Sequence, residues 1–461
     1  MKNKVLSKKI RIAYFLRNLD FLFLPEGESE LFAILPKNSE EERMARGELF
    51  LKNFLPVEPK KTKKNFSELS VEEIIKHSNL TQKLKELKID CLFIRNSSNF
   101  LRRWSLKNKI ILLTPNYQLQ EKFENKIYFE KFLRRWKIFR AKSRILNLKL
   151  AFLPFPKTVL QIPNSTGGEG TFIANSKEVF KRILRKLRIP LLAREYKEGL
   201  PLGVSLFITR ERIYFSAIDR QCLYEAGEKN RLGFFRGIQW LPYTFFTRAT
   251  AKGEDEATAS STTPKVYKRI EESLLKIGKK IRKRGLTGLV NLDFILDENN
   301  RIYFLECNPR STAATPQIIA FPELNGNVNF LRLFLNHYWN KKFFIPNQNS
   351  LPESNFKGAQ MVIELPSSIK FPKKTKRIIE GGFFVFENGK LKKIKLKNRF
   401  DFLKLKRGLF FYNEVNKGEI YKKRVDTGTV LSNFPLYDFW TGNLSRVGKR
   451  VYNFFSNPNR N

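Results

Sequence analysis

Two apolar runs around a polar turn constrain this chain more than any other stretch of its sequence. The segment VNLDFILDENNRIYFLECNPR, residues 290–310, alternates apolar and polar side chains with the period of two that a β-hairpin requires. A turn at residues 298–301 sets Asp293 opposite Glu306 on the neighbouring strand. The pattern therefore predicts a hairpin that carries two facing carboxylates.

The same register predicts what else lies on each face of the hairpin. Asn291 lies opposite Asn308 on the face that holds the two acids. The other face alternates like a protein core, and it is expected to bury Leu292, Phe294 and Leu296 against Tyr303, Leu305 and Cys307.

Two opposed carboxylates repel each other, because their side chains start only about 4.5–5.5 Å apart, so they need a compensating charge. A lysine can supply it. A hard cation such as Mg²⁺ is the alternative, since it commonly takes one or two carboxylates and leaves its other positions to water and nucleotide phosphates. The amide oxygen of Asn308 suits such a site, and the guanidinium of Arg310, on the same side, matches phosphate oxygens.

Composition narrows the class of protein. The chain has 461 residues, enough for roughly two to four domains. Its 87 Lys and Arg against 44 Asp and Glu give a net charge of +43, which favours anionic partners but is spread along the chain, as in a solvated basic surface. Three scattered cysteines and two histidines indicate neither a disulfide framework nor a zinc site.

The chain divides into three predicted regions. Residues 1–118 alternate strand-like runs with helical segments, which predicts a small parallel-sheet α/β domain. Residues 119–345 combine helices with hairpins and include an α+β lobe at about 157–222. Residues 356–461 are rich in strand patterns and predict a small β domain closed by a helix.

A glycine-rich turn, NSTGGEGTF, joins two predicted strands. Its glycines, Gly167, Gly168 and Gly170, do not open directly onto a helix, and no Gly-Lys-Ser/Thr follows them. This order disfavours both a Walker loop and a dinucleotide-binding fingerprint.

The hairpin, with GLTGLVNLDF before its turn and YFLECNPR after it, resembles the metal-binding hairpin of the ATP-grasp superfamily. That superfamily includes biotin carboxylase, carbamoyl phosphate synthetase and D-alanine–D-alanine ligase. The resemblance implies that Asp293, Glu306 and Asn308 hold Mg²⁺ or Mn²⁺. It also implies that Arg310 steadies the phosphoryl group that is transferred.

Other segments fall in the order that this family uses, over about residues 110–340. ENKIYFEKFLRRWKI resembles the helix that leads into the ATP-binding lobe, which implies that Lys126 touches a nucleotide phosphate. NSTGGEGTF resembles the lid loop, whose backbone N–H groups approach phosphates because glycine has no obstructing side chain. AREYKEG resembles the strand that binds adenine, which implies contacts from Glu195, Tyr196 and Lys197.

Two positions depart from the family pattern. The strand that enters the glycine loop usually carries a lysine, whereas VLQIP has Gln161, whose amide can still donate a hydrogen bond to a phosphate. The first metal carboxylate is Asp293, where several members have glutamate, and the shorter side chain remains compatible with metal binding. Metal and nucleotide binding are therefore expected, and the substrate class stays open.

The resemblance implies an ADP-forming ligase that uses ATP and Mg²⁺. A carboxylate attacks the γ-phosphate of ATP, and an amine or similar nucleophile then takes the acyl phosphate. Small-molecule carboxylate and amine substrates are expected, including anionic ones, since a basic surface raises their encounter rate. Candidate substrate contacts near the metal and nucleotide positions in sequence are Gln221, Ser311 and Thr312.

A nucleic-acid-binding protein that keeps this fold without ligase turnover is the competing hypothesis. In KFLRRWKIFRAKSRILNLK, the aromatic residues Phe132, Trp136 and Phe139 alternate with lysines and arginines. An amphipathic helix with a solvated basic face explains the same pattern.

The N-terminal sequence bears on the compartment of the protein. Charged residues interrupt its apolar stretch and no small-residue cleavage site follows, so neither a signal peptide nor a membrane span is expected. These features predict a cytoplasmic protein.

Overall fold

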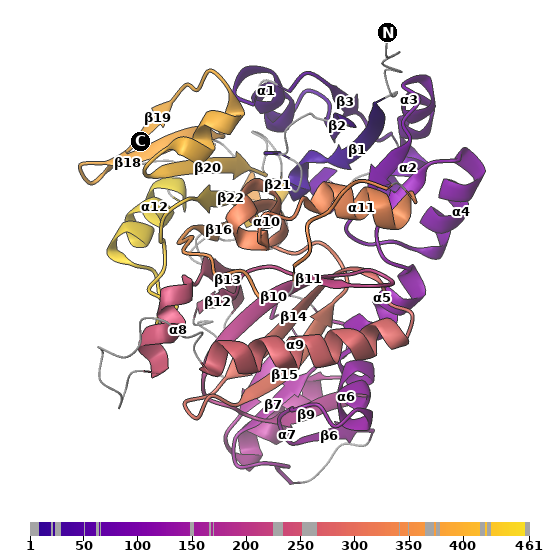
Figure 1. Cartoon of the computed structure of the whole chain (residues 1–461). Coiled ribbons are helices and arrows are strands. Elements are labelled where there is room, and N and C mark those ends of the chain that lie inside the picture. Colours follow the sequence, from indigo (N-terminus) through magenta and orange to yellow (C-terminus); the bar gives the residue numbers. More distant parts are fainter. Residues whose placement is uncertain are drawn as a thin grey trace.

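Five parallel strands form the N-terminal sheet in the computed structural model, in the order β3-β2-β1-β4-β5 (Figure 1). This confirms the small parallel sheet predicted near the N-terminus. Apolar side chains are buried on both faces, as expected where a parallel sheet is covered on both sides. The strands are β1 Ile10–Phe15, β2 Ser29–Pro36, β3 Phe54–Val57, β4 Cys91–Phe93 and β5 Ile111–Leu113, and the helices among them are α1 Glu40–Gly47, α2 Val71–His77, α3 Leu80–Glu86 and α4 Asn99–Asn108.

The structure describes residues 9–456 apart from several short segments. Those segments are residues 20–21, 24–28, 50, 61–63, 65, 148–151, 166, 169, 225–233, 251–264, 341, 349, 365–372, 375–378, 415–419 and 422–425. The first eight residues of the N-terminal sequence therefore lie outside the described residues.

Two short helices, α5 Tyr117–Glu124 and α6 Lys126–Arg135, follow the N-terminal sheet. Asn125 separates them and caps α6, because its side chain accepts a hydrogen bond from the backbone N–H of Tyr128 at 3.0 Å. The predicted amphipathic face of α6 is buried, including Phe129 and Phe132. This cap fixes Lys126 at the first position of the helix.

A small lobe follows, built on four strands in the order β6-β9-β7-β8. Helix α7, Lys177–Lys186, packs on it through Phe180, Ile183 and Leu184. The strands are β6 Ser143–Leu146, β7 Thr158–Gln161, β8 Thr171–Ala174 and β9 Leu191–Glu195. In Figure 1 this lobe lies at the bottom of the molecule, below the long helix α9, Lys265–Lys283.

The remaining strands of the middle region belong to a second, much larger sheet. It has eleven strands in the order β15-β14-β10-β12-β13-β16-β22-β20-β18-β19, with β11 paired to β10. Helix α9 packs against β10 and β11 through its apolar stripe. The strands are β10 Leu200–Ile208, β11 Ile213–Phe215, β12 Asp219–Tyr224, β13 Phe234–Trp240, β14 Gly288–Leu296, β15 Ile302–Asn308, β16 Ala359–Glu364, β18 Gly382–Glu387, β19 Lys390–Ile394, β20 Gly408–Asn413 and β22 Asp426–Ser432.

Two of the domain boundaries that were expected from the sequence differ from the structure, because the strands concerned belong to the large sheet. The lobe predicted for about residues 157–222 ends earlier, because the strands after residue 199 pair in the large sheet. The strands of residues 356–461 do not form a sheet of their own, since β16 pairs with β13 and continues the large sheet. The closing helix is present as α12, Arg446–Ser456, and it buries Val451 and Phe455.

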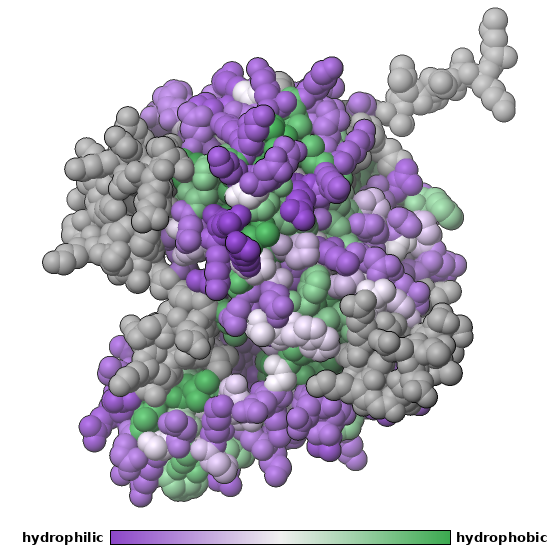
Figure 2. Space-filling model, turned by 90° about the vertical axis from the view of Figure 1, so that its left-hand side faces the viewer, coloured by the Kyte–Doolittle hydropathy of each residue, from purple (hydrophilic) through white to green (hydrophobic). Residues whose placement is uncertain are grey.

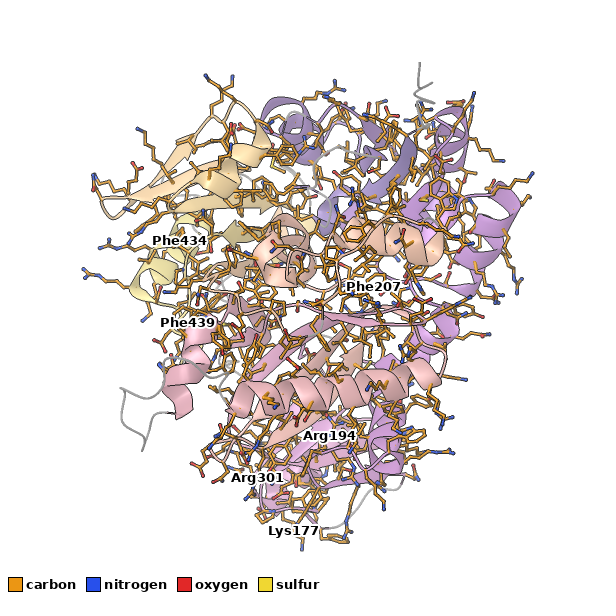
Figure 3. The ribbon with its side chains drawn as sticks, in the orientation of Figure 1. Lys177, Arg194, Phe207, Arg301, Phe434 and Phe439 are labelled. Atoms are coloured by element: carbon orange, nitrogen blue, oxygen red, sulfur yellow. The ribbon has the colours of Figure 1, made fainter. Side chains whose placement is uncertain are left out.

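Aromatic packing joins the N-terminal sheet to the large sheet. Phe334 on α11, Phe330–Tyr338, lies between Phe93 of β4 and Phe207 of β10, with ring centroids 5.3 Å and 5.0 Å away. Figure 3 labels Phe207. These edge-to-face pairs, with the buried side chains around them, place the two sheets against each other. The face drawn in Figure 2 is dominated by hydrophilic side chains, in keeping with the +43 charge.

None of the helices in the described part of the chain is both long and apolar enough to cross a membrane. The three cysteines are all buried and free.

Candidate active site

The hairpin formed by β14 and β15 carries the residues that the sequence singles out. Asp293 lies opposite Glu306 and Asn291 opposite Asn308, in the predicted register. The turn is closed by Asp297, whose Oδ1 accepts hydrogen bonds from the backbone N–H groups of Asn299 and Arg301 at 3.0 and 2.8 Å.

The predicted register of the other face is wrong beyond Asp293. A shift that skips Leu305 places Phe294 opposite Phe304, where Leu305 was expected, and Leu296 opposite Ile302. One extra residue on β15 makes this a β-bulge, which turns the following side chains to the opposite face. Phe304 is therefore buried in the core, whereas Leu305 lines a cavity.

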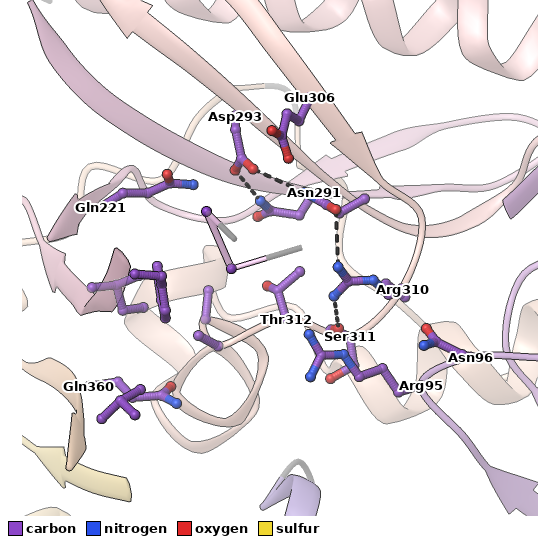
Figure 4. A pocket seen from close by; sticks show the side chains of 18 of the residues that line it. Arg95, Asn96, Gln221, Asn291, Asp293, Glu306, Arg310, Ser311, Thr312 and Gln360 are labelled. Atoms are coloured by element: carbon purple, nitrogen blue, oxygen red, sulfur yellow. Dashed lines mark hydrogen bonds between the residues drawn. The ribbon is translucent and has the colours of Figure 1, made fainter. Parts of the chain in front are cut away.

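The Asp293 carboxylate is almost completely buried and is held by two amides. Its oxygens accept hydrogen bonds from Asn291 Nδ2 at 2.7 Å and from Asn308 Nδ2 at 2.9 Å (Figure 4). Burial, and after it the negative charge of Glu306, raise the pKa of Asp293 from 3.8 to about 7. The negative charge at this position is therefore incompletely compensated by the surrounding protein.

Glu306 has a lysine near it, as one of the two alternatives from the sequence requires. The Nζ atom of Lys126 lies 3.4 Å from Glu306 Oε1 and donates a hydrogen bond to the carbonyl oxygen of Ser165 at 2.5 Å. Gln161 Nε2 also reaches Glu306 Oε1, at 3.4 Å. The Nζ atom of Lys126 thus contacts both the Ser165 carbonyl oxygen and Glu306. Of the two facing acids, Asp293 and Glu306, it is Glu306 that this lysine contacts.

The hairpin also fits a divalent cation. Among the described residues no group of three or more His, Cys, Asp and Glu side chains is arranged to hold a metal, so the candidate ligands are Asp293, Glu306 and the amide of Asn308. This set agrees with Mg²⁺, which binds through one or two carboxylates and keeps water or phosphate at its other positions. A cation here would also offset the repulsion that raises the pKa of Asp293.

Arg310 is held rigidly beside these ligands. Its Nε donates to Glu124 Oε1 at 2.6 Å, its Nη2 to Asn308 Oδ1 at 3.1 Å and its Nη1 to the carbonyl oxygen of Ser311 at 3.3 Å. Figure 4 shows Arg310 next to Ser311. Glu124, at the end of α5, was not singled out by the sequence. The guanidinium is thus fixed at the cavity wall, two residues from Asn308.

An arginine of the small lobe lies beside Gln161. Gln161 Oε1 accepts a hydrogen bond from Arg194 Nη1 at 2.8 Å, and Arg194 Nη2 lies 3.2 Å from the buried carboxylate of Glu130. Figure 3 labels Arg194 within the small lobe. Sequence reasoning missed this residue, although it immediately precedes Glu195 in the segment AREYKEG.

The glycine turn joins β7 to β8, as predicted. Gly167 and Gly168 have φ angles of 63° and 82°, which glycine adopts without strain. Thr171 N–H donates to the carbonyl oxygen of Gly168 at 3.0 Å, and Ile162 N–H to that of Gly170 at 2.9 Å. These two hydrogen bonds connect the described residues of the loop to the neighbouring ends of β7 and β8.

The segment proposed to contact adenine lies at the end of β9. Lys197 Nζ pairs with Glu195 Oε2 at 3.1 Å, and the Nζ atom of Lys157 lies 3.5 Å from the centre of the Tyr196 ring. All three segment residues, Glu195, Tyr196 and Lys197, line the same cavity as the hairpin.

One cavity of about 1020 Å³ brings most of these residues together. It lies between the small lobe, the large sheet and the N-terminal sheet, and it exceeds what a single drug-sized ligand needs. Lys126 and Gly170 are not among its lining residues, although Lys126 contacts Glu306. The predicted residues that line it are Gln161, Gly167, Gly168, Glu195, Tyr196, Lys197, Gln221, Asp293, Glu306, Asn308, Arg310, Ser311 and Thr312.

The raised pKa of Asp293 predicts how stability depends on pH in the absence of metal. The carboxyl is protonated in both folded and unfolded protein below about pH 4, and the cost of ionising it in the folded state grows as the pH rises towards 7. Between about pH 5 and about pH 8 the free energy of unfolding should fall by roughly 3 kcal/mol more in wild type than in Asp293→Asn. Urea denaturation at both pH values measures this difference, and equal slopes would contradict the raised pKa.

Comparison with known proteins identifies part of the chain. Residues 125–314 match the family model of the ATP-grasp domain. The butirosin acyl-carrier protein–L-glutamate ligase of Niallia circulans is 26% identical over 168 residues, which make up 35% of this chain and 34% of that enzyme. The chain thus matches about a third of the length of this curated relative.

Solved structures share the fold over almost the whole chain. The biotin carboxylase domain of 2-oxoglutarate carboxylase from Hydrogenobacter thermophilus, in complex with MgADP and bicarbonate, aligns with a TM-score of 0.58 at 12% identity, covering 93% of this chain and 87% of that one. L-amino acid ligase from Bacillus licheniformis aligns with a TM-score of 0.51 at 13% identity, covering 98% of both chains. The chain therefore has the ATP-grasp fold, and its residues 125–314 match the ATP-grasp domain.

Proposed function

We propose that this protein is an ADP-forming ligase that activates a carboxylate with ATP and joins it to an amine. The observation that carries the proposal is the arrangement of two facing carboxylates, Asp293 and Glu306, beside the fixed guanidinium of Arg310 in one cavity. Acidic ligands for a cation next to a cationic group for phosphate suit phosphoryl transfer.

In the first step the oxygen of the substrate carboxylate attacks the γ-phosphorus of ATP. The new bond is O–P, the bond to the β-phosphate oxygen breaks, and ADP leaves with the electron pair. Arg310 offsets the negative charge that develops on the transferred group, and Glu124 and Asn308 hold its guanidinium in place. Mg²⁺ held by Asp293, Glu306 and Asn308 would supply further charge compensation on the phosphates.

In the second step an amine, after its ammonium form has lost a proton, attacks the acyl carbon. The C–N bond forms, the bond between the acyl carbon and the phosphate oxygen breaks, and phosphate leaves. A second proton then leaves the nitrogen, so the products are an amide, ADP and phosphate.

We place the nucleotide between the small lobe and the edge of the large sheet. Lys126, Gln161 and the backbone of Gly167 and Gly168 contact its phosphates in this proposal. Arg194 restores a positive charge where the family's lysine is replaced by Gln161, since the two side chains share a hydrogen bond of 2.8 Å. Glu195, Tyr196 and Lys197 contact the base and ribose.

The named relatives guide the choice of substrates. The relative from Niallia circulans is described as joining L-glutamate to an acyl-carrier protein, and the Bacillus licheniformis enzyme as an L-amino acid ligase. An amino acid is therefore a reasonable first class to test, as acid or as amine. We also expect the enzyme to act in the cytoplasm, where ATP is available.

A hydroxylamine screen tests this function directly. Hydroxylamine captures acyl phosphates as hydroxamates, so it replaces the unknown amine while the common L-amino acids and other small carboxylic acids are screened with ATP and Mg²⁺. We expect at least one acid to give hydroxamate and ADP in equal amounts, and neither product without Mg²⁺. Well-folded protein that binds no Mg-nucleotide and yields no hydroxamate would overturn the proposal.

The nucleic-acid hypothesis receives limited support from the described residues. Phe132 is buried in the core, and the Trp136 ring is covered by Lys280, whose Nζ lies 4.3 Å from its centre. Phe139 is the exposed aromatic side chain of the three. Titration with single-stranded RNA at several salt concentrations distinguishes the two functions, because phosphate contacts give a steep loss of affinity with salt.

A further inference from the structure

A third carboxylate, that of Asp219, lies in the same cavity as the hairpin acids. Asp219 begins β12, is 2% exposed and lines the cavity wall. Among the described residues, no side chain or backbone N–H donates a hydrogen bond to its carboxylate, and no cation pairs with it. A buried carboxylate without such a partner is costly, which suggests that a ligand supplies the missing charge.

A glycine makes room for this carboxylate. Gly203 on β10 pairs with Asp219 on one side and with Asp293 on the other. A Cβ atom on Gly203 would lie only 2.8 Å from Asp219 Oδ1 and 2.9 Å from Oδ2. The Asp219 carboxylate therefore occupies the space above Gly203, on the side of Asp293.

The surroundings of Asp219 raise its pKa to about 8, first through burial and then through the charge of Asp293. Opposite charge for Asp219 is absent from the described groups around it, since the neighbouring Arg220 donates instead to the carbonyl oxygen of Phe439 at 2.8 Å. Geometry and electrostatics thus agree that the protein itself does not compensate this carboxylate.

Polar and aliphatic side chains continue from Asp219 across the sheet. Gln221 on β12, Ile238 on β13 and Gln360 on β16 lie in one row, because Gln221 pairs with Ile238 and Ile238 with Gln360. The Gln360 side chain is 8% exposed, and its Oε1 has no hydrogen-bond partner. Figure 4 shows Gln221 and Gln360 on the same side of the pocket, away from Arg310.

The charge of the cavity differs from that of the chain. Its described lining contains eight acidic side chains, Glu41, Glu68, Glu72, Glu195, Asp219, Asp293, Glu306 and Glu414, and five basic ones, Arg17, Arg95, Arg194, Lys197 and Arg310. The chain as a whole has twice as many basic as acidic residues. A cavity that reverses this ratio favours a cationic ligand over an anionic one.

We propose that Asp219 binds the ammonium group of the amine substrate, with Gln360 accepting a further hydrogen bond from the same substrate. This inference rests on the proposed ligase function and names its second substrate as a small organic amine that enters as a cation. In this arrangement the nucleotide and the metal bind over strands β15 and β14 of the large sheet. The amine binds further along the same sheet, over β12 to β16. Four strand spacings separate β14 from β16, about 19 Å, which leaves room for the acid and the amine end to end.

Calorimetry with propylammonium chloride tests the cation subsite without requiring turnover. The titration uses the full chain with Mg²⁺ and ADP, with sodium chloride at equal ionic strength and propanol as a neutral probe. We expect propylammonium to bind wild type and to bind Asp219→Asn about 10- to 100-fold more weakly, as for the loss of a charged hydrogen bond. Asp401→Asn, which lies outside the cavity, should bind it like wild type.

Hydroxylamine provides the second measurement, because it is largely uncharged at neutral pH. Propylammonium should inhibit hydroxamate formation by Asp219→Asn at least about 10-fold more weakly than it inhibits the wild-type reaction, with each protein compared with its own rate in the absence of propylammonium. Gln360→Leu should weaken propylammonium binding less than Asp219→Asn does, since it removes an uncharged acceptor.

Each contrary outcome is distinct. Absence of propylammonium binding to wild type, or equal binding to Asp219→Asn, overturns the ammonium subsite. Weaker binding of the Mg-nucleotide by Asp219→Asn, with a normal melting temperature, identifies Asp219 as a metal ligand and also overturns it. Failure of wild type to form any hydroxamate contradicts the ligase function, while the calorimetric result still decides whether the subsite binds cations.

Discussion

Replacing Glu306 by glutamine is expected to lower ATP-dependent hydroxamate formation about 100- to 1,000-fold while the protein keeps its fold. Glutamine has almost the same shape but no charge, so one of the two facing carboxylates no longer attracts a cation. Affinity for the Mg-nucleotide should fall as well. Calorimetry with ADP and Mg²⁺ measures the affinity, and a thermal melt of the same sample reports the fold.

The hairpin offers a matched control for this variant. Glu298 lies on the exposed turn of the same hairpin, outside the cavity, so Glu298→Gln removes one charge from the same element without touching the site. It should retain wild-type turnover and affinity. An Asp293→Asn, Glu306→Gln double variant that folds normally and still releases ADP at the wild-type rate would exclude the hairpin as the catalytic centre.

Replacing Arg194 by methionine is expected to destabilise the small lobe by about 3–5 kcal/mol. Arg194 is 2% exposed, and its Nη2 lies 3.2 Å from Glu130 Oε2, whose side chain is fully buried. Removing the arginine leaves Glu130 with Arg140 as its remaining charged partner, at 3.1 Å. The melting temperature should fall by roughly 10 °C, given about 2–4 °C per kcal/mol for a domain of 150–250 residues.

Two further variants separate the lost ion pair from lost packing. Arg185→Met changes an exposed arginine on α7 of the same lobe and should leave the melting temperature unchanged. An Arg194→Met, Glu130→Leu double variant should regain much of the lost stability, because both buried charges are then gone. Differential scanning calorimetry of the three variants measures these effects. A wild-type melting temperature in Arg194→Met would show that the buried pair contributes nothing.

The register of the hairpin was predictable from sequence because it depends on local information. Alternation with a period of two and a polar turn fix which residues face one another near Asp293 and Glu306. The bulge at Leu305 was not predictable, since Tyr303, Phe304 and Leu305 are consecutive large apolar residues and any of them could face the core. Which one turns away is decided by the packing around the strand.

The sequence also could not predict which sheet each strand joins. The segments IPLLAREY and GVSLFIT read alike as strands, but β9 joins the small lobe and β10 joins the large sheet. Strand patterns describe which face of a strand is apolar, and they do not identify its neighbours. Asp219 escaped notice for the same reason, because its place beside Asp293 depends on Gly203 of β10 lying between them.

Arg194, the arginine beside Gln161, could not be identified from the sequence. Gln161 was recognised as a departure from the family pattern, yet its partner Arg194 comes from a different strand, separated by 33 residues. Only the pairing of Val159 with Arg194 between β7 and β9 brings that side chain next to Gln161.

The continuity of the large sheet determines where the chain can be cut. Strand β13 has β12 on one side and β16 on the other, so the last hundred residues cover a sheet edge within the ATP-grasp region. A fragment that ended at residue 345 would expose the backbone N–H and C=O groups of β13 and would invite aggregation by edge-to-edge pairing. Residues 125–314 are thus a recognisable unit of sequence but not a self-sufficient unit of structure.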